Sequence, residues 1–507
     1  MRNIVVWGRS NYPWLREPFL NRLKAGENAK VHFICAGPED IIYWKKEDKG
    51  KTIDTFVTTN RFFAEYDRCF EPPEEIFGKA RRYEEKYGML VADLLQTDRH
   101  LGRGFASGGI GHPKSELSDK ASYEKSVTIY NKIIDFWEDY FDRTDPDLII
   151  GVIAGVIGKG CAAVARHRGI PMRTLASAKY KSYYYWIDSE YYTCPDIRRN
   201  FESLRSKVVL SGEIEDTGEM WLPEIIAIHK RFARFSSKRE LVKRILAQLK
   251  RHIYRRYKRI VSMGNYKLSE QVRYLFRIYR DIKLLDKLKT IDMRKLSGWK
   301  YVFVALNTEP EVATGVYSPE FNEQLAMIEL LAKNLPAGVR LAVKEHPVAI
   351  GRRPRDFYST IEEIPNAVIV SPKEDALCVI KNALCVAVIT STCGTEAAIM
   401  GVPVISFGVH NNFNFLPHAH VVESWKELRP LLSRLCAVDT DEARDKRRKD
   451  GLKYLEALKA SSIILDTTDN GKNMRFTPDN VELIYSSLKN TVKSGAADEL
   501  KNSYSLY

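Results

Sequence analysis

Short apolar runs alternate with amphipathic segments in the first part of the chain. Residues 4–7 and 31–35 are apolar runs typical of buried strands, and residues 15–23 between them have the period of a helix. A second unit of the same kind follows at residues 147–152 and 160–168. Alternation of strands with helices predicts a parallel sheet covered on both faces, as in Rossmann-like domains.

The same alternation returns after residue 300. Continuous apolar runs predict strands buried on both faces, and they occupy residues 301–306, 341–343, 384–389 and 404–407. Periodic segments between these runs predict the crossover helices of a second parallel sheet. The hydrophobic pattern therefore indicates a second Rossmann-like domain.

A histidine and a proline end the strand expected at residues 341–343. Pro347 cannot donate to a sheet ladder, so His346 lies at the carboxyl end of this strand, two residues after Lys344. In an open parallel sheet, ligands bind outside this edge. We therefore expect His346 to face a ligand.

A loop rich in small hydroxyl side chains follows the strand at residues 384–389. It contains Ser391, Thr392 and Gly394, and residues 395–400 continue as a helix. Unpaired backbone N–H groups and the positive end of the helix dipole meet at this loop. Such a point attracts an oxyanion, for example a nucleotide phosphate.

Each motif also has a purely structural explanation. A Ser-Thr pair before a helix is commonly an N-cap, and a His-Pro pair after a strand is commonly a loop. Both motifs, however, lie at the carboxyl ends of strands in one series of strands and helices, where spatial convergence is expected. This conjunction favours one shared phosphate site made by His346, Ser391 and Thr392.

Four separated blocks carry a resemblance to a known family: residues 301–306, residues 310–314, residues 344–347 (Lys-Glu-His-Pro), and residues 391–405, which begin Ser-Thr-Cys-Gly-Thr-Glu. The chain resembles bacterial capsule polysaccharide synthesis proteins over residues 301–408. That family includes transferases of 3-deoxy-manno-octulosonic acid (Kdo) and is similar in layout to bacterial sialyltransferases. The family tends to place a histidine or glutamine ahead of Pro-Glu, where this chain has residues 307–309 (Asn-Thr-Glu).

The resemblance implies a GT-B fold, in which two Rossmann-like domains face a cleft, and a glycosyltransferase that needs no metal or cofactor. The donor is a nucleotide sugar, with a CMP-linked keto-sugar acid favoured, and the acceptor is a glycan or glycolipid. The implied nucleotide contacts are Lys344, His346, Pro347, Ser391, Thr392, Gly394 and Glu396, with an imidazolium at His346. Glu396 either reaches a ribose hydroxyl or complements the helix dipole.

A catalytic carboxylate is expected across the cleft from the nucleotide. Asp98 lies in a polar loop after the helical pattern of residues 83–95, and Glu311 lies in the Pro-Glu loop. Such a charged loop is also typical of an ordinary solvated surface. Asp98 and Glu311 are therefore two rival candidates.

The positive charge of the chain is concentrated in one block. Residues 230–300 hold 23 Lys or Arg and five Asp or Glu, a net +18, whereas the whole chain carries +14. Residues 238–259 have the pattern of a basic amphipathic helix. It is either a solvated helix packed on the protein or a contact with the anionic inner leaflet. Nucleic acid is the weakest alternative, because no binding motif accompanies the charge. The expected membrane contacts are Lys243, Arg244, Lys250, Arg251 and Arg255.

Length and composition set the domain organisation. A chain of 507 residues exceeds one ordinary core. We expect an acceptor domain at 1–210, a basic linker or insertion at 211–298, a nucleotide-sugar domain at 299–430, and helices and a tail at 431–507. The eight cysteines are scattered without zinc spacing, and no run is long enough to span a membrane. These features favour a cytoplasmic protein, at most peripheral on the inner face of the plasma membrane.

Other functions remain open at the level of sequence. A UDP-sugar 2-epimerase or a CDP-glycerol-type transferase shares two Rossmann-like halves. A non-catalytic polysaccharide assembly factor would keep the fold and use the basic block. The sugar, the linkage, the stereochemical outcome and the oligomeric state leave no pattern in the sequence.

Overall fold

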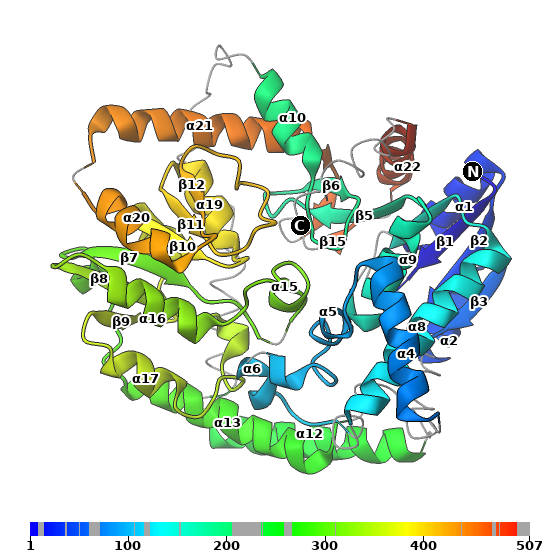
Figure 1. Cartoon of the computed structure of the whole chain (residues 1–507), viewed down its shortest axis with the longest axis horizontal. Coiled ribbons are helices and arrows are strands. Elements are labelled where there is room, and N and C mark those ends of the chain that lie inside the picture. Colours follow the sequence, from blue (N-terminus) through cyan, green and yellow to red (C-terminus); the bar gives the residue numbers. More distant parts are fainter. Residues whose placement is uncertain are drawn as a thin grey trace.

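The computed structural model describes residues 1–8, 15–35, 38–49, 51–59, 71–105, 107–115, 122–151, 154–204, 235, 237–257, 266–309, 311–437, 439–468, 473–475 and 477–493. Two α/β domains stand side by side, with two long helices along one edge (Figure 1). Between the large sheets, helices and loops of both domains approach each other. The two-domain GT-B architecture expected from the sequence is thus confirmed.

The first domain is built on a seven-stranded sheet of order β13-β6-β5-β4-β1-β2-β3. Its strands are β1 (Asn3–Trp7), β2 (Lys30–Cys35), β3 (Thr55–Thr58), β4 (Leu148–Gly151), β5 (Met172–Ser177), β6 (Tyr183–Ile187) and β13 (Ile463–Ile464). The strands from β3 to β5 pair in parallel, and the pairings of β6 with β5 and β13 are antiparallel. The predicted parallel sheet is therefore confirmed, with an antiparallel edge.

Helices cover both faces of this sheet. Val5 and Trp7 of β1 point into one apolar core, and Ile4 and Val6 point into another. This is the burial on both faces that a continuous apolar strand predicts. The first core packs against α4 (Pro73–Tyr87), α5 (Val91–Leu95), α8 (Tyr123–Thr144) and α9 (Gly155–His167). The second packs against α1 (Glu17–Glu27), α2 (Pro38–Glu47) and α22 (Pro478–Lys493).

The second domain holds a six-stranded sheet of order β12-β11-β10-β7-β8-β9, and all its pairings are parallel. Its strands are β7 (Lys300–Ala305), β8 (Val339–Lys344), β9 (Ala367–Val370), β10 (Cys385–Val388), β11 (Val404–Ser406) and β12 (Ala419–Val421). β7 lies between β8 and β10. The carboxyl ends of these three strands therefore meet at one edge of the sheet.

The helices of the second domain again divide between two faces. They are α16 (Gln324–Asn334), α17 (Phe357–Glu363), α18 (Ala376–Lys381), α19 (Thr392–Met400), α20 (Leu428–Leu435) and α21 (Asp441–Ala460). The remaining shorter elements are α6 (Ser107–Gly111), α10 (Pro195–Ser203), α14 (Met293–Leu296), α15 (Val312–Gly315), β14 (Thr467–Thr468) and β15 (Asn473–Met474).

The basic block forms two long helices, α12 (Lys238–Tyr257) and α13 (Leu268–Lys287), which pack against each other. Leu275, Ile278 and Ile282 of α13 are buried in the core of the second domain. The segment expected as a linker thus supplies part of that core. Within the described residues, no helix is long and apolar enough to cross a membrane.

The chain returns to the first domain at its end. α22 packs against α1, where Tyr485 donates a hydrogen bond to Glu27 at 2.8 Å. Oγ1 of Thr477 accepts from the backbone N–H of Asn480 at 3.2 Å. Thr477 is therefore the N-cap of α22, and Pro478 occupies the first helical position.

Candidate functional site

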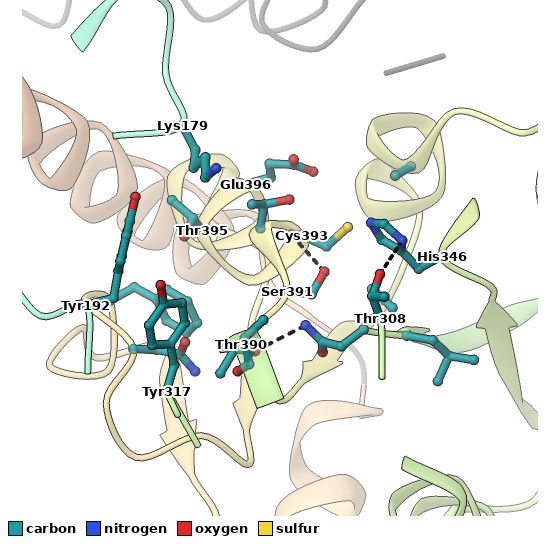
Figure 2. A pocket seen from close by; sticks show the side chains of 18 of the residues that line it. Lys179, Tyr192, Thr308, Tyr317, His346, Thr390, Ser391, Cys393, Thr395 and Glu396 are labelled. Atoms are coloured by element: carbon teal, nitrogen blue, oxygen red, sulfur yellow. Dashed lines mark hydrogen bonds between the residues drawn. The ribbon is translucent and has the colours of Figure 1, made fainter. Parts of the chain in front are cut away.

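A cavity of about 630 Å³ lies between the two domains. Arg99, Lys179 and Tyr192 line it from the first domain. His346 and Ser391 line it from the second domain, together with the loops that follow β7, β8 and β10 (Figure 2). The two motifs that the sequence predicts to converge therefore share one cavity.

Hydrogen bonds join the ends of the three central strands. Oγ1 of Thr308, after β7, lies 2.8 Å from Nδ1 of His346, after β8 (Figure 2). Nδ2 of Asn307 donates to Oγ1 of Thr390, after β10, at 3.1 Å. The residues that follow β7 thus contact both the histidine and the hydroxyl loop. These contacts hold the two motifs at a fixed separation.

The imidazole of His346 is neutral near pH 7. Burial lowers its pKa to about 4, against the opposing effect of the Glu345 carboxylate. The backbone N–H of Val348 donates to Nδ1 at 3.2 Å, so the ring proton resides on Nε2. The structure therefore differs from the expected imidazolium at His346. The ring is a neutral imidazole whose Nε2–H can donate to a ligand.

The hydroxyl loop opens α19. Oγ of Ser391 accepts from the backbone N–H of Cys393 at 3.4 Å, so Ser391 is the N-cap of this helix. Thr392, Thr395 and Glu396 also line the cavity. The helix begins at Thr392, three residues earlier than the sequence pattern indicates. The positive end of its dipole therefore lies at the cavity wall.

Gly394 has a packing role behind the cavity wall. A Cβ atom at this position would lie 2.7 Å from the Phe413 ring and 2.8 Å from Cγ2 of Val388. Gly394 is buried and is not among the described residues that line the cavity. Its absent side chain lets the first turn of α19 lie close to β10.

The two residues beside His346 are placed differently. Pro347 lines the cavity and begins a short 3₁₀ turn of residues Pro347–Ala349. Lys344 also lines the cavity, but it is 7% exposed, and Nζ donates to the carbonyl of Pro372 at 3.3 Å. Both residues thus shape the wall in which His346 is set.

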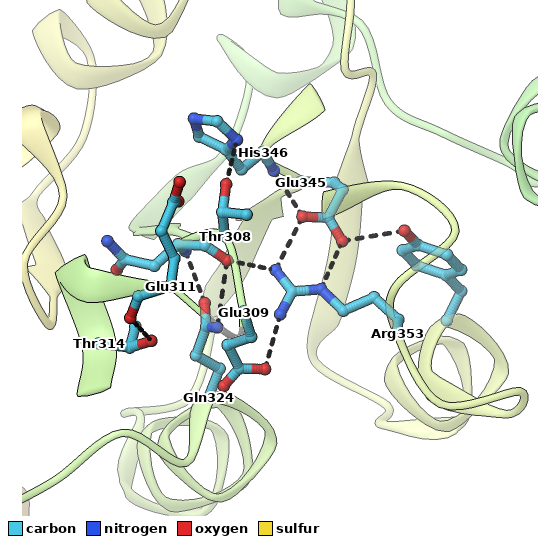
Figure 3. A network of polar contacts seen from close by, with 10 residues as sticks. Thr308, Glu309, Glu311, Thr314, Gln324, Glu345, His346 and Arg353 are labelled. Atoms are coloured by element: carbon cyan, nitrogen blue, oxygen red, sulfur yellow. Dashed lines mark hydrogen bonds and ion pairs between the residues drawn. The ribbon is translucent and has the colours of Figure 1, made fainter. Parts of the chain in front are cut away.

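A fully buried guanidinium holds the loops after β7 and β8 (Figure 3). Arg353 donates to Glu345 at 2.8 and 2.9 Å and to Glu309 at 3.0 Å. It also donates to the backbone carbonyl of Asn307 at 2.7 Å. Glu345 in turn accepts from the backbone N–H of His346 at 2.6 Å. Arg353 therefore fixes the backbone on both sides of the contact between Thr308 and His346.

Only one of the two candidate carboxylates lines the cavity. Glu311 is exposed and lies on the cavity wall at the start of α15. Asp98 is not among the described lining residues, and its Oδ1 accepts from the backbone N–H groups of His100 at 2.8 Å and Leu101 at 2.9 Å. The geometry gives Asp98 a loop-stabilising contact and brings its neighbour Arg99 to the cavity instead.

Aromatic and amide contacts join the domains beside the cavity. The rings of Tyr191 and His410 stack with centroids 4.0 Å apart, and His410 pairs with Glu320 at 3.0 Å. The backbone N–H of Cys194 donates to Asn412 at 2.8 Å. Sequence reasoning missed this part of the site, because these side chains follow no buried strand pattern that would reveal their position.

The basic residues of α12 lie away from the cavity. Lys250 and Arg251 are exposed, and Lys243 pairs with Glu240 at 2.9 Å. Arg244 stacks on the Phe235 ring at 4.3 Å, and Arg255 is half-buried. The structure therefore separates five residues that the sequence grouped together as membrane contacts. In the parts of the chain that the structure describes, no three His, Cys, Asp or Glu side chains group as metal ligands.

Comparisons with known proteins find a family similarity over a part of the chain that includes His346 and Ser391. Residues 223–415 match the family model of the capsule polysaccharide biosynthesis protein. No curated protein matches the chain. Among solved structures, UDP-GlcNAc 2-epimerase from Methanocaldococcus jannaschii is 12% identical, with 91% of this chain and 100% of that chain covered and a TM-score of 0.24.

Two structures of KpsC from Thermosulfurimonas dismutans are similarly distant. The beta Kdo 2,7 transferase is 12% identical over 73% of this chain and 90% of that chain, with a TM-score of 0.30. The beta Kdo 2,4 transferase is 13% identical over 58% and 78%, with a TM-score of 0.28. The family model spans the four sequence blocks, so the resemblance is confirmed: residues 223–415 of this chain, which has a GT-B fold, are similar to capsule polysaccharide biosynthesis proteins.

Proposed function

We propose that the chain is a nucleotide-sugar-dependent glycosyltransferase of surface or capsular polysaccharide synthesis. One observation carries this proposal: His346 and the Ser391 end of α19 line a single cavity that residues of the first domain close from the other side. These residues fall inside the segment that matches the capsule polysaccharide family. A glycan or glycolipid acceptor enters from the side of the first domain.

The donor phosphate lies between His346 and the first turn of α19. Negative charge grows on the departing nucleotide as the glycosidic bond breaks. The Nε2–H of His346 and the backbone N–H groups at the helix start stabilise that charge. Thr308 orients the His346 ring in advance, and Arg353 fixes the loop that carries Thr308. In this proposal these donors take the place of a metal ion.

A CMP-linked keto-sugar acid, such as Kdo, is the favoured donor. The sequence resemblance supports it, and the charges of the first domain agree with an acidic sugar. Arg99 and Lys179 line the cavity from that side and can attract a sugar carboxylate. Glu311 is the carboxylate that activates the acceptor hydroxyl, because it lines the cavity and Asp98 does not.

A thermal-shift panel with CMP, CDP, UDP and GDP tests the donor class. We expect CMP to raise the melting temperature, and we expect His346→Ala to remove this shift. Stabilisation by UDP together with interconversion of UDP-linked epimers would replace the proposal with an epimerase. No stabilisation by any nucleotide would favour a non-catalytic assembly factor.

A further inference from the structure

α12 presents an apolar stripe to solvent. Val242, Leu246, Leu249 and Ile253 follow the spacing of one helix face, and their exposed fractions are between 39% and 59%. An exposed apolar face on a packed helix indicates an interaction surface. The opposite situation is found for Leu241, which is 5% exposed and packs into the core of the second domain.

Basic residues flank this stripe on both sides. On one side, Arg239 lies three residues before Val242, and Lys250 lies four residues after Leu246. On the other side, Lys238 lies four residues before Val242, and Arg256 lies three residues after Ile253. Each is exposed. Arg251, by contrast, follows Val242 by nine residues, about two and a half turns, and so lies on the opposite face of the helix.

The helix is held rigidly enough to present this face. α13 is anchored by Leu275, Ile278 and Ile282 in the core of the second domain, and α12 packs along α13. The two helices form one outer edge of the molecule (Figure 1). Arg244 is turned inward onto Phe235, and its charge does not contribute to the stripe.

We propose that the stripe Val242, Leu246, Leu249 and Ile253, with the flanking Lys238, Arg239, Lys250 and Arg256, is a docking surface for an anionic lipid bilayer. The apolar side chains enter the boundary between headgroups and acyl chains, and the flanking cations contact lipid phosphates. Docking in this way lays α12 in the plane of the interface. This surface is separate from the cavity, so it does not depend on the proposed transferase activity.

Vesicle flotation of the full chain tests the proposal. We expect binding to vesicles of phosphatidylcholine with phosphatidylglycerol, weaker binding at higher salt, and little binding to phosphatidylcholine alone. The double variant Leu246→Ser with Ile253→Ser should weaken binding by at least about tenfold. Both side chains are solvent-exposed, so its melting temperature should equal that of the unmodified protein.

Two single variants with the same loss of charge form a matched pair. Lys250→Gln should weaken vesicle binding about fivefold, and Arg251→Gln, on the opposite face, should leave it unchanged. Equal losses in the two variants would overturn the proposal, because they would indicate nonspecific attraction by net charge. Full vesicle binding by the double serine variant would also overturn it. A third outcome would assign the stripe to a second copy of the chain. In that case the unmodified protein does not bind vesicles and is a dimer in light scattering, and only the double serine variant is a monomer.

Discussion

Oγ1 of Thr308 lies 2.8 Å from Nδ1 of His346, and the backbone N–H of Val348 approaches the same nitrogen at 3.2 Å. Nδ1 is therefore an acceptor, and Nε2 carries the ring proton. The backbone N–H of Val348 thus sets the tautomer of His346, and the hydroxyl at the end of β7 adds a second contact to the same nitrogen. Second-neighbour contacts of this kind orient a ligand-binding imidazole.

His346→Ala removes the Nε2–H donor from the cavity. We expect the rate of transfer to fall by about 10²–10³, as for the loss of one pre-positioned donor to a developing anion. Thr308→Val keeps the imidazole but removes one contact that orients it. The rate of transfer should therefore fall less in this variant than in His346→Ala. Steady-state kinetics of both variants check this order. Equal activity of His346→Ala and the unmodified protein would contradict a role for His346 at the leaving phosphate.

His346 makes stability depend on pH. Its pKa is about 4 in the folded chain and near 6.5 when unfolded, so the unfolded state binds more protons between these values. Stability should be fully present above pH 6.5 and fall as the pH drops toward 4, by up to about 3 kcal/mol from this residue. Lys344, Glu345, Arg352 and Arg353 are the charges that act on the ring.

Urea unfolding at several pH values isolates this contribution. Other buried histidines, such as His112 with its pKa lowered to about 2, also make the free energy of unfolding depend on pH. Their contribution is the same in the unmodified protein and in the variant His346→Asn, so it cancels in the difference between the two. The difference in unfolding free energy between the unmodified protein and His346→Asn should therefore decrease as the pH falls from 6.5 to 4. A difference that stays constant over this range would show that the folded imidazole titrates normally.

Arg353→Met leaves two buried carboxylates, Glu309 and Glu345, without their cation. We expect a loss of about 3–5 kcal/mol in the free energy of unfolding. Tyr358→Phe removes one hydrogen bond to Glu345, which measures 2.9 Å, and should cost about 1.5 kcal/mol or less. Chemical denaturation measures both. A Met variant as stable as the Phe variant would show that the guanidinium does not organise the loops after β7 and β8.

The two candidate carboxylates are separated by conservative amide variants. Glu311→Gln should reduce transfer by about 10²–10⁴ while nucleotide binding is retained, because only the proton acceptor is lost. Asp98→Asn keeps an oxygen that can accept from His100 and Leu101, so activity should be unchanged. The reverse order of severity would move catalysis to Asp98. Nucleotide-dependent melting shifts serve as the binding control.

Gly394→Ala tests the close contact of α19 with β10. The added Cβ would lie under 3 Å from Phe413 and Val388, both buried, so one of them must move. We expect a destabilisation of about 1–3 kcal/mol and a weaker nucleotide-dependent melting shift. Thr395→Ala, in the next position of the same helix, is the matched control for stability only, because Thr395 lines the cavity. Unchanged stability of Gly394→Ala would show that the helix has room to shift.

The sequence predicts the second domain well for a simple reason. Residues 341–347 and 384–394 combine a continuous apolar strand with a strand terminator, and parallel topology then places His346 and Ser391 at the same sheet edge. The buried partners of His346 were not predictable. Glu345 has the charge typical of a surface residue, and its burial is explained by its pairing with Arg353, eight residues later, together with its hydrogen bond from Tyr358.

The contribution of the first domain was equally difficult to predict. Arg99 and Lys179 reach the cavity from a loop and a hairpin, where no periodic pattern fixes the direction of a side chain. The fourfold spacing of Leu241, Ile245, Leu249, Ile253 and Tyr257 predicts a single apolar face on α12. Instead, Leu241 is buried and Leu249 and Ile253 are exposed, because the helix turns a different face toward α13. Sequence periodicity alone does not say which face meets a neighbour.

The return of the chain to its first domain has a consequence for biosynthesis. β13 pairs with β6, and α22 contributes Ile484 and Leu488 to the core beneath β1. A ribosome makes these two pieces after the entire second domain. The domain that is translated first can therefore reach its native packing only after the other has left the exit tunnel. Until then its incomplete core exposes apolar surface of the kind that chaperones bind.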